Sequence, residues 1–210
     1  MKMRSTKIGI MLATALFVGV AASAQYRGTA QAVVQYSVGI PMGSLKSAVP
    51  DVSARGARVA LYFGINDNLA IGGGAGYQDF YQKKDRALYK LEDGSDISAV
   101  RSYSIQTIPI LFESKWNFSP GKAIQPYVGL GIGGNLVNYN DYLGEFGSEQ
   151  KTAFGFAARP HAGVYIPFRK HGESGFTLSG SYSIMPFKTS ALSNLNHIGI
   201  HAGVTLPMRK

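Results

Sequence analysis

The stretch PYVGLGIGGNLVNY, residues 126–139, carries bulky apolar side chains at alternate positions and very small or polar ones between them. The bulky positions are Val128, Leu130, Ile132 and Leu136, and the small ones are Gly129, Gly131, Gly133 and Asn135. A period of two residues is that of a β-strand, whose successive side chains point to opposite faces. Glycine is depleted from ordinary strands, so a face lined with glycine indicates a place where space is short. The interior of a narrow closed barrel is such a place.

The same alternation recurs in seven further segments of the chain. They are residues 32–42, 55–65, 69–78, 107–118, 154–166, 176–184 and 197–206. Four charged residues within these segments fall on the face with the small side chains, namely Arg58, Glu113, Lys115 and Arg159. A lipid-facing exterior explains their placement, because a basic residue at the midplane of that face costs about 2–4 kcal/mol. The pattern therefore predicts bulky side chains facing lipid and small or charged ones facing the barrel interior.

The connections between these segments support the same fold. Short turns, such as residues 66–68, alternate with longer connections at 43–54, 82–101 and 140–151. Outer-membrane barrels have short periplasmic turns and longer extracellular loops. A closed sheet also satisfies every backbone amide within the bilayer, with strands of about 9–11 residues. We predict an all-β fold, an eight-stranded antiparallel up-and-down transmembrane β-barrel with both termini in the periplasm.

The first residues have the features of a secretory signal peptide. Three basic residues precede the uncharged apolar run IGIMLATALFVGVAA, and a small-x-small triplet ends at Ala24. We predict a signal peptide over residues 1–24 and the barrel domain over residues 25–210. The net charge is +9, but the basic residues are scattered along the chain. They form no basic stripe of the kind that binds nucleic acid. The absence of cysteine excludes disulfides and thiolate sites.

Two long stretches resemble a known family. Its central hairpin resembles the strand, turn and glycine-rich strand TIPILFESKWNFSPGKAIQPYVGLGIGGNL. Its last strand resembles the closing segment LSNLNHIGIHAGVTL. The family is the eight-stranded outer-membrane β-barrel domain of Gram-negative bacteria, a porin-like family. The resemblance implies outer-membrane lipid and the barrel-insertion machinery as partners. This chain ends in TLPMRK, whereas such chains often end in an aromatic residue that the machinery reads.

The charged and histidine side chains of the small face are the candidate site. We expect Arg58, Glu113, Lys115, Arg159, His161, His197 and His201 to form a hydrogen-bonded structural network that fills the lumen, because buried charges must pair. A narrow proton or ion path is the alternative. His197 and His201 lie about 13 Å apart on a strand, so they cannot share one metal ion. The G-x-G-x-x-G match at 129–134 continues as a strand, which is not the context of a nucleotide site. We expect no catalytic residue, cofactor or metal.

Aromatic residues near the strand ends predict two interfacial belts. One comprises Trp116, Phe118, Tyr127, Tyr165 and Phe168, and the other Tyr77, Phe80, Tyr81, Tyr103, Tyr139 and Tyr142. We expect a monomeric, non-enzymatic envelope protein with a structural or adhesive role. The alternatives are a membrane-embedded enzyme of the lipid acyltransferase or protease type, an accessory of a secretion or assembly machine, and a soluble lipocalin-like carrier.

Overall fold

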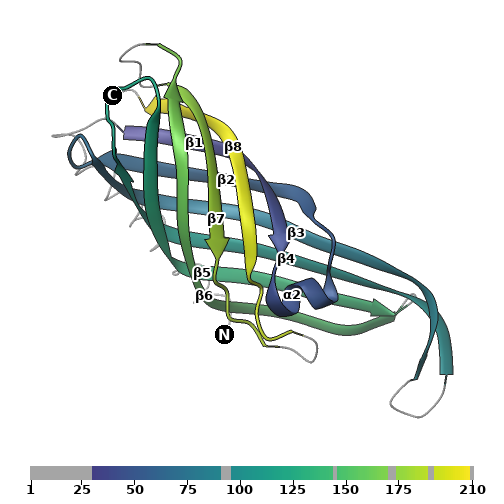
Figure 1. Cartoon of the computed structure of the whole chain (residues 1–210). Helices are drawn as coiled ribbons and strands as arrows, with labels where there is room; N and C mark the ends of the chain where they lie inside the picture. The colour runs from purple at the N-terminus through teal and green to yellow at the C-terminus, as the bar shows by residue number, and fades with distance from the viewer. Residues whose placement is uncertain (1–29, 91–95, 144–145, 170–173, 189–191, 209–210) are drawn as a thin grey trace, which may run out of the picture.

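Eight antiparallel strands close into a barrel in the computed structural model (Figure 1), which describes residues 30–90, 96–143, 146–169, 174–188 and 192–208. The elements are β1 (Ala30–Pro41), α2 (Gly43–Ala48), β2 (Ser53–Gly64), β3 (Leu69–Lys90), β4 (Asp96–Asn117), β5 (Gln125–Leu143), β6 (Phe146–Pro167), β7 (Gly175–Ser183) and β8 (His197–Met208). Each strand pairs with its neighbour in sequence, and β1 pairs with β8 from Ala30↔Met208 to Pro41↔His197. The predicted eight-stranded up-and-down barrel is confirmed. The predicted signal peptide lies outside the described residues.

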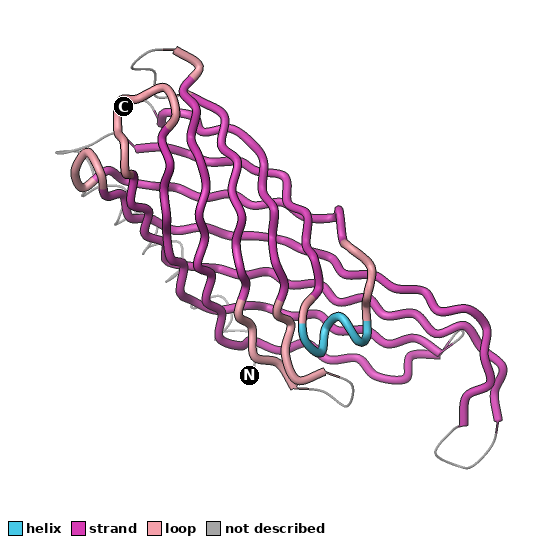
Figure 2. Tube along the Cα trace, viewed as in Figure 1, coloured by secondary structure: helices cyan, strands magenta, loops and turns pink. Residues whose placement is uncertain are grey.

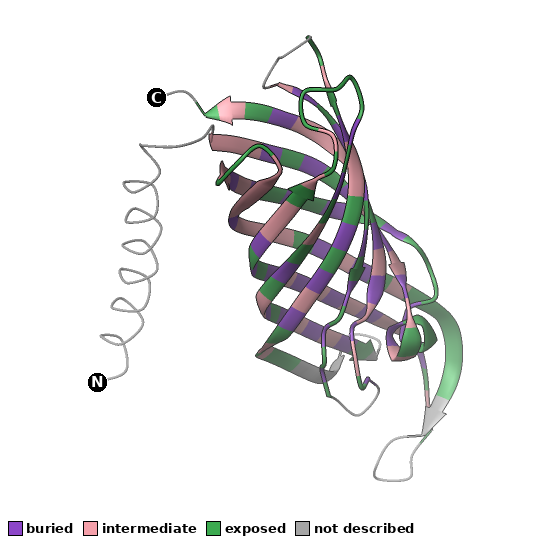
Figure 3. Ribbon diagram, turned by 60° about the vertical axis from the view of Figure 1, so that its left-hand side comes forward, coloured by how far each residue is buried: buried purple, intermediate pink, exposed green. Residues whose placement is uncertain are grey.

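The two faces of the barrel wall divide as the alternation predicts. Buried and exposed residues alternate along the strands in Figure 3. Leu130, Phe156 and Ile200 are 44%, 52% and 47% exposed on the outer face. Arg159 and His201 are 5% and 6% exposed on the inner face. Apolar side chains therefore point outward, which contradicts the lipocalin-like carrier, whose apolar face would point inward.

Four adjacent strands are longer than a membrane crossing requires. β3, β4 and β6 have 22 residues each and β5 has 19, against about 9–11 for one crossing. The prediction of loops at 82–101 and 140–151 is therefore wrong for most of their length. Paired strands occupy 82–90, 96–101 and 146–151. Figure 1 shows these strands running past the ends of β7 and β8.

The end of the barrel at which β3 to β6 extend is filled by an apolar cluster. The helix α2, which the sequence alternation did not predict, lies at this end (Figure 2). Its Leu45 is fully buried, as are Val49 after the helix and Leu195 in the β7–β8 connection. Around them pack side chains of the barrel wall: Phe80, Tyr103, Ile105, Leu111, Val137, Tyr139 and Ala157. We call this cluster the apolar seal.

Hydrogen bonds fasten α2 to the connection between β7 and β8. Ser44 Oγ donates to the Asn194 carbonyl at 3.0 Å and accepts from the amides of Ser193 and Asn194 at 3.1 and 3.0 Å. The Met42 amide also donates to the Asn196 carbonyl at 2.9 Å. Because β1 and β8 are neighbours in the barrel, these two connections meet over its opening. No helix among the described residues is long and apolar enough to cross a membrane.

The predicted aromatic belts are correct for part of their members. Trp116, Phe118 and Phe168 are exposed on the outer face near one end, and Tyr77, Tyr81 and Tyr142 near the other. Tyr127, Tyr165, Phe80, Tyr103 and Tyr139 are instead buried. Their positions along each strand share the face of the inward glycines and charges, so these five rings fill the interior and cannot contact lipid.

Candidate functional site

The candidate site is the polar interior of the barrel below the apolar seal. Of its seven predicted members, Arg58 lies on β2, Glu113 and Lys115 on β4, Arg159 and His161 on β6, and His197 and His201 on β8. Six are 1–7% exposed, and Lys115 is half-buried. The strands thus bring all seven side chains into one lumen, although not into a single hydrogen-bonded group.

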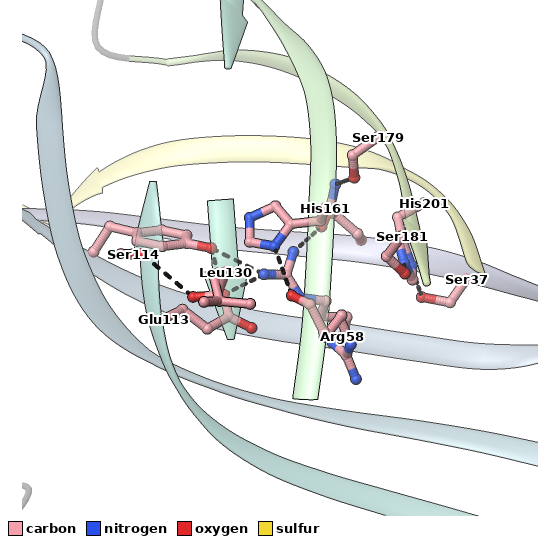
Figure 4. Close-up of polar contacts among 12 residues, drawn as sticks. Ser37, Arg58, Glu113, Ser114, Leu130, His161, Ser179, Ser181 and His201 are labelled. Atoms are coloured by element: carbon pink, nitrogen blue, oxygen red, sulfur yellow. Dashed lines mark hydrogen bonds and ion pairs between the residues drawn. The ribbon is translucent and has the colours of Figure 1, made fainter. Parts of the chain in front are cut away.

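Arg58 and Glu113 form a buried ion pair across the lumen (Figure 4). The Arg58 Nη2 group and the Tyr62 hydroxyl both donate to the same oxygen of Glu113. Arg58 Nη1 also donates to Gln35 Oε1 at 2.6 Å, and Gln35 Nε2 donates to Ser179 Oγ at 3.3 Å. This chain of contacts runs from β4 through β2 and β1 to β7, so it crosses the inside of the barrel.

Lys115 lies on the side of that pair away from the apolar seal, between two tyrosine rings. Its ammonium nitrogen is 4.7 Å from the ring centroid of Tyr62 and 5.6 Å from that of Tyr127. A cation over an aromatic face is attracted by the ring quadrupole. Beyond this layer, a cavity of about 140 Å³ opens towards the short turns at the other end of the barrel, and Asn117, Gln125 and Tyr165 are among its lining residues.

The histidines of β8 lie deeper, towards the apolar seal. His201 Nδ1 contacts Ser37 Oγ at 2.7 Å, and its Nε2 contacts Ser181 Oγ at 2.8 Å. His197 donates from Nδ1 to the Leu195 carbonyl at 3.1 Å, and its ring packs edge-on against Phe80. His161 Nδ1 lies 3.4 Å from the carbonyl of Arg159. The three histidines thus bond to different partners.

The serine and histidine contacts do not resemble a catalytic triad. A triad histidine is oriented by a carboxylate on one nitrogen and activates a nucleophile with the other. Both nitrogens of His201 are instead occupied by serine hydroxyls, and Ser37, Ser181 and His201 are all buried. Among the described residues no group of three or more His, Asp or Glu side chains could hold a metal ion.

Comparison with known proteins places this geometry in a family. The model of the outer membrane protein beta-barrel domain matches residues 10–206, which is most of the chain. The chain belongs to the outer membrane protein beta-barrel domain family. It is therefore an outer-membrane protein of the Gram-negative type, and its apolar outer face contacts lipid. No curated protein matches its sequence.

The chain is similar to solved structures of other outer membrane barrels. Neisserial surface protein A, from Neisseria, is 13% identical, with a TM-score of 0.54 over 86% of this chain and 96% of that chain. The N-terminal β-barrel domain of Pseudomonas aeruginosa OprF is 10% identical, with a TM-score of 0.44 over 86% of this chain and 100% of that chain. Yersinia pestis Ail, the attachment invasion locus protein, is 11% identical, with a TM-score of 0.43 over 85% and 97%. At these identities the likeness to Neisserial surface protein A shows the fold alone.

Several residues that make contacts inside the barrel were not among the site residues predicted from the sequence. Tyr62, Tyr127, Gln35 and Ser37 all take part in the contacts described above. Each shares the strand face of an inward charge or glycine, so the period of two residues was sufficient to find them. The partners across the lumen were not available from the sequence, because they depend on which strands face each other in the closed barrel.

Proposed function

We propose that this outer-membrane barrel is a non-enzymatic envelope protein with a structural or adhesive role, and that it acts through the part of its sheet outside the membrane. The observation that carries the proposal is the length of β3 to β6. We define the projecting sheet as residues 79–90, 96–106, 137–143 and 146–153, which continue these strands beyond β2 and β7. A hydrogen-bonded sheet presents its side chains in fixed positions, which reduces the entropic cost of binding a partner.

The side chains of the projecting sheet combine aromatic rings with charges. Tyr81 is 43% exposed, and the Arg55 guanidinium lies 5.5 Å from its ring centroid. On the inner face, Arg101 donates to Asp141 from Nε at 3.0 Å and from Nη2 at 2.5 Å. These hydrogen bonds raise the pKa of Arg101 above its ordinary value. Aromatic and arginine side chains are enriched where proteins bind other proteins, which supports an interaction surface here.

We expect neither transport nor catalysis to be the main role of the barrel interior. An eight-stranded barrel is just wide enough for its interior to be filled with side chains. Here the apolar seal fills one end, and Arg58 and Tyr62 of β2 bind Glu113 of β4 inside the lumen below it. The Ser37–His201–Ser181 contact is buried and has no carboxylate partner among the described residues. We therefore expect the function of the protein to depend on the external surface of the barrel.

The test removes the outer part of one hairpin and leaves the barrel intact. Lys83 and Ser102 are paired across β3 and β4, so an Asn-Gly turn in place of residues 84–101 would close the shortened hairpin. Cells that carry this variant should insert it in the outer membrane but lose attachment to surfaces or other cells. The control replaces the periplasmic Lys122 by Ala, which should leave attachment unchanged. Unaltered attachment by the shortened protein would contradict the proposal.

A further inference from the structure

The interior of the barrel holds more positive than negative charge. Within the described residues, Arg58, Lys115 and Arg159 face the lumen below the apolar seal with Glu113 as the one carboxylate. Glu113 is bonded to Arg58 and Tyr62, and Lys115 lies between two tyrosine rings. Arg159 therefore has to be neutralised by something else, because an arginine side chain does not lose its proton in a protein.

Arg159 is the least satisfied of these groups. It is 5% exposed, its Nε–H has no hydrogen-bond acceptor, and no carboxylate of the described chain lies within 4.0 Å of its guanidinium. Its Nη2 end reaches across to β3, where a Cβ added to Gly76 would lie 3.5 Å from it. The effective cost of an uncompensated buried ion is several kcal/mol, so the position of this side chain requires a compensating charge.

A small cavity adjoins both arginines. It measures about 10 Å³ and is lined by Arg58, Arg159, Ser37, Thr107, His197 and His201, among others. This is about the least volume that holds one water-sized particle. Arg58 uses Nη1 and Nη2 for Gln35, Tyr62 and Glu113, but its Nε–H also lacks an acceptor. Arg58 and Arg159 thus both line this cavity, and each has an Nε–H group without an acceptor.

The other polar residues around the cavity are bonded elsewhere. His201 uses both ring nitrogens for Ser37 and Ser181. His197 Nδ1 donates to the Leu195 carbonyl, and Thr107 Oγ1 donates to the Gln78 carbonyl at 3.3 Å. The described residues therefore leave the Nε–H group of Arg58 and the guanidinium of Arg159 with unused donors at this cavity, and its surroundings favour negative charge.

We propose that this cavity binds a small monovalent inorganic anion of the halide class, held between the Nε–H groups of Arg58 and Arg159. A halide accepts hydrogen bonds from several directions and supplies the negative charge that a water molecule cannot. The cavity lies between the apolar seal on one side and the Tyr62–Lys115–Tyr127 layer on the other.

The test uses bromide, because its anomalous scattering distinguishes it from water. The full-length mature protein is folded and crystallised in sodium bromide, and its melting temperature is compared after folding in bromide or in gluconate at one ionic strength. We expect an anomalous peak within hydrogen-bonding distance of both Nε atoms, and a melting temperature at least roughly 2–4 °C higher in bromide.

Two variants separate this site from general salt effects. Arg159→Met should remove the difference between bromide and gluconate. Arg55→Met should keep it, because the Arg55 side chain is 65% exposed outside the barrel wall. The absence of a bromide peak, or an equal bromide effect in Arg159→Met, would overturn the proposal. If Arg159→Met does not fold, the anomalous map of the unaltered protein decides alone.

Discussion

At the scale of single residues, the lumen is organised by one buried ion pair. Glu113 is 1% exposed and accepts from both Arg58 and Tyr62, while Gln35 holds the other side of the guanidinium. Taking two charges out of water is costly, so such a pair contributes little net stability over apolar residues of the same volume. Removal of one partner is different, because it leaves the other charge buried and unpaired.

Glu113→Gln should therefore lower the free energy of unfolding by about 3–5 kcal/mol. Urea unfolding in phospholipid vesicles, followed by the fluorescence of the single tryptophan, Trp116, measures this change. The matched control is Asp79→Asn, which breaks the pair with Arg55 at 3.5 Å. Because Arg55 is largely exposed, this change should cost about 0–1 kcal/mol. Equal effects of the two substitutions would mean that the lumen is hydrated like the surface.

The glycines of the small face can be tested in the same way. A Cβ on Gly129 would lie 2.4 Å from the Ser114 carbonyl oxygen and 2.4 Å from His161 Nε2. Gly129→Ala should therefore destabilise the barrel by about 1–3 kcal/mol, as overpacking does. Gly180→Ala is the control, because its Cβ would meet a carbonyl oxygen at 4.0 Å. If both variants unfold at the same urea concentration, the inner face around Gly129 is not crowded.

At the scale of elements, α2 and the β7–β8 connection act as one closure. Leu45 and Leu195 are fully buried, and Ser44 joins the two segments by three hydrogen bonds. Short helices have little stability of their own in water, so the six residues of α2 depend on this packing.

Leu45→Ala should cost about 2–5 kcal/mol of unfolding free energy, because it leaves a cavity in the apolar seal. Ser47→Ala, on the exposed side of the same helix, should change stability by less than about 0.5 kcal/mol. Hydrogen exchange of the amides of residues 43–49 would locate the loss. If Leu45→Ala left both stability and exchange unchanged, the seal would not be a packed part of the barrel.

The period of two residues predicted the membrane part of each strand and the direction of its side chains. The same period failed beyond the membrane, where QKKDRALYK at 82–90 is a strand with water on its outer side. A strand outside the bilayer needs no apolar face towards lipid, so its alternation is lost. α2 was missed because six residues are too few to show a helical period. The pairing of Arg58 with Glu113 depends on the register of the closed sheet.

At the scale of the whole molecule, the barrel combines a filled interior with a sheet that stands outside the membrane. The wall contacts lipid through its apolar face, the lumen is crossed by polar contacts, and the apolar seal fills the end that carries the projecting sheet. We expect a chain built in this way to bind partners through its outer surface and to conduct no solutes through its lumen.

Electrical recording from planar lipid bilayers tests the central claim, that the lumen is closed, most directly. The purified, folded protein should insert without producing steady conductance steps in concentrated potassium chloride, and Ser47→Ala should behave identically. Stable, uniform steps that scale with the number of inserted molecules would show a continuous water-filled path and contradict the account.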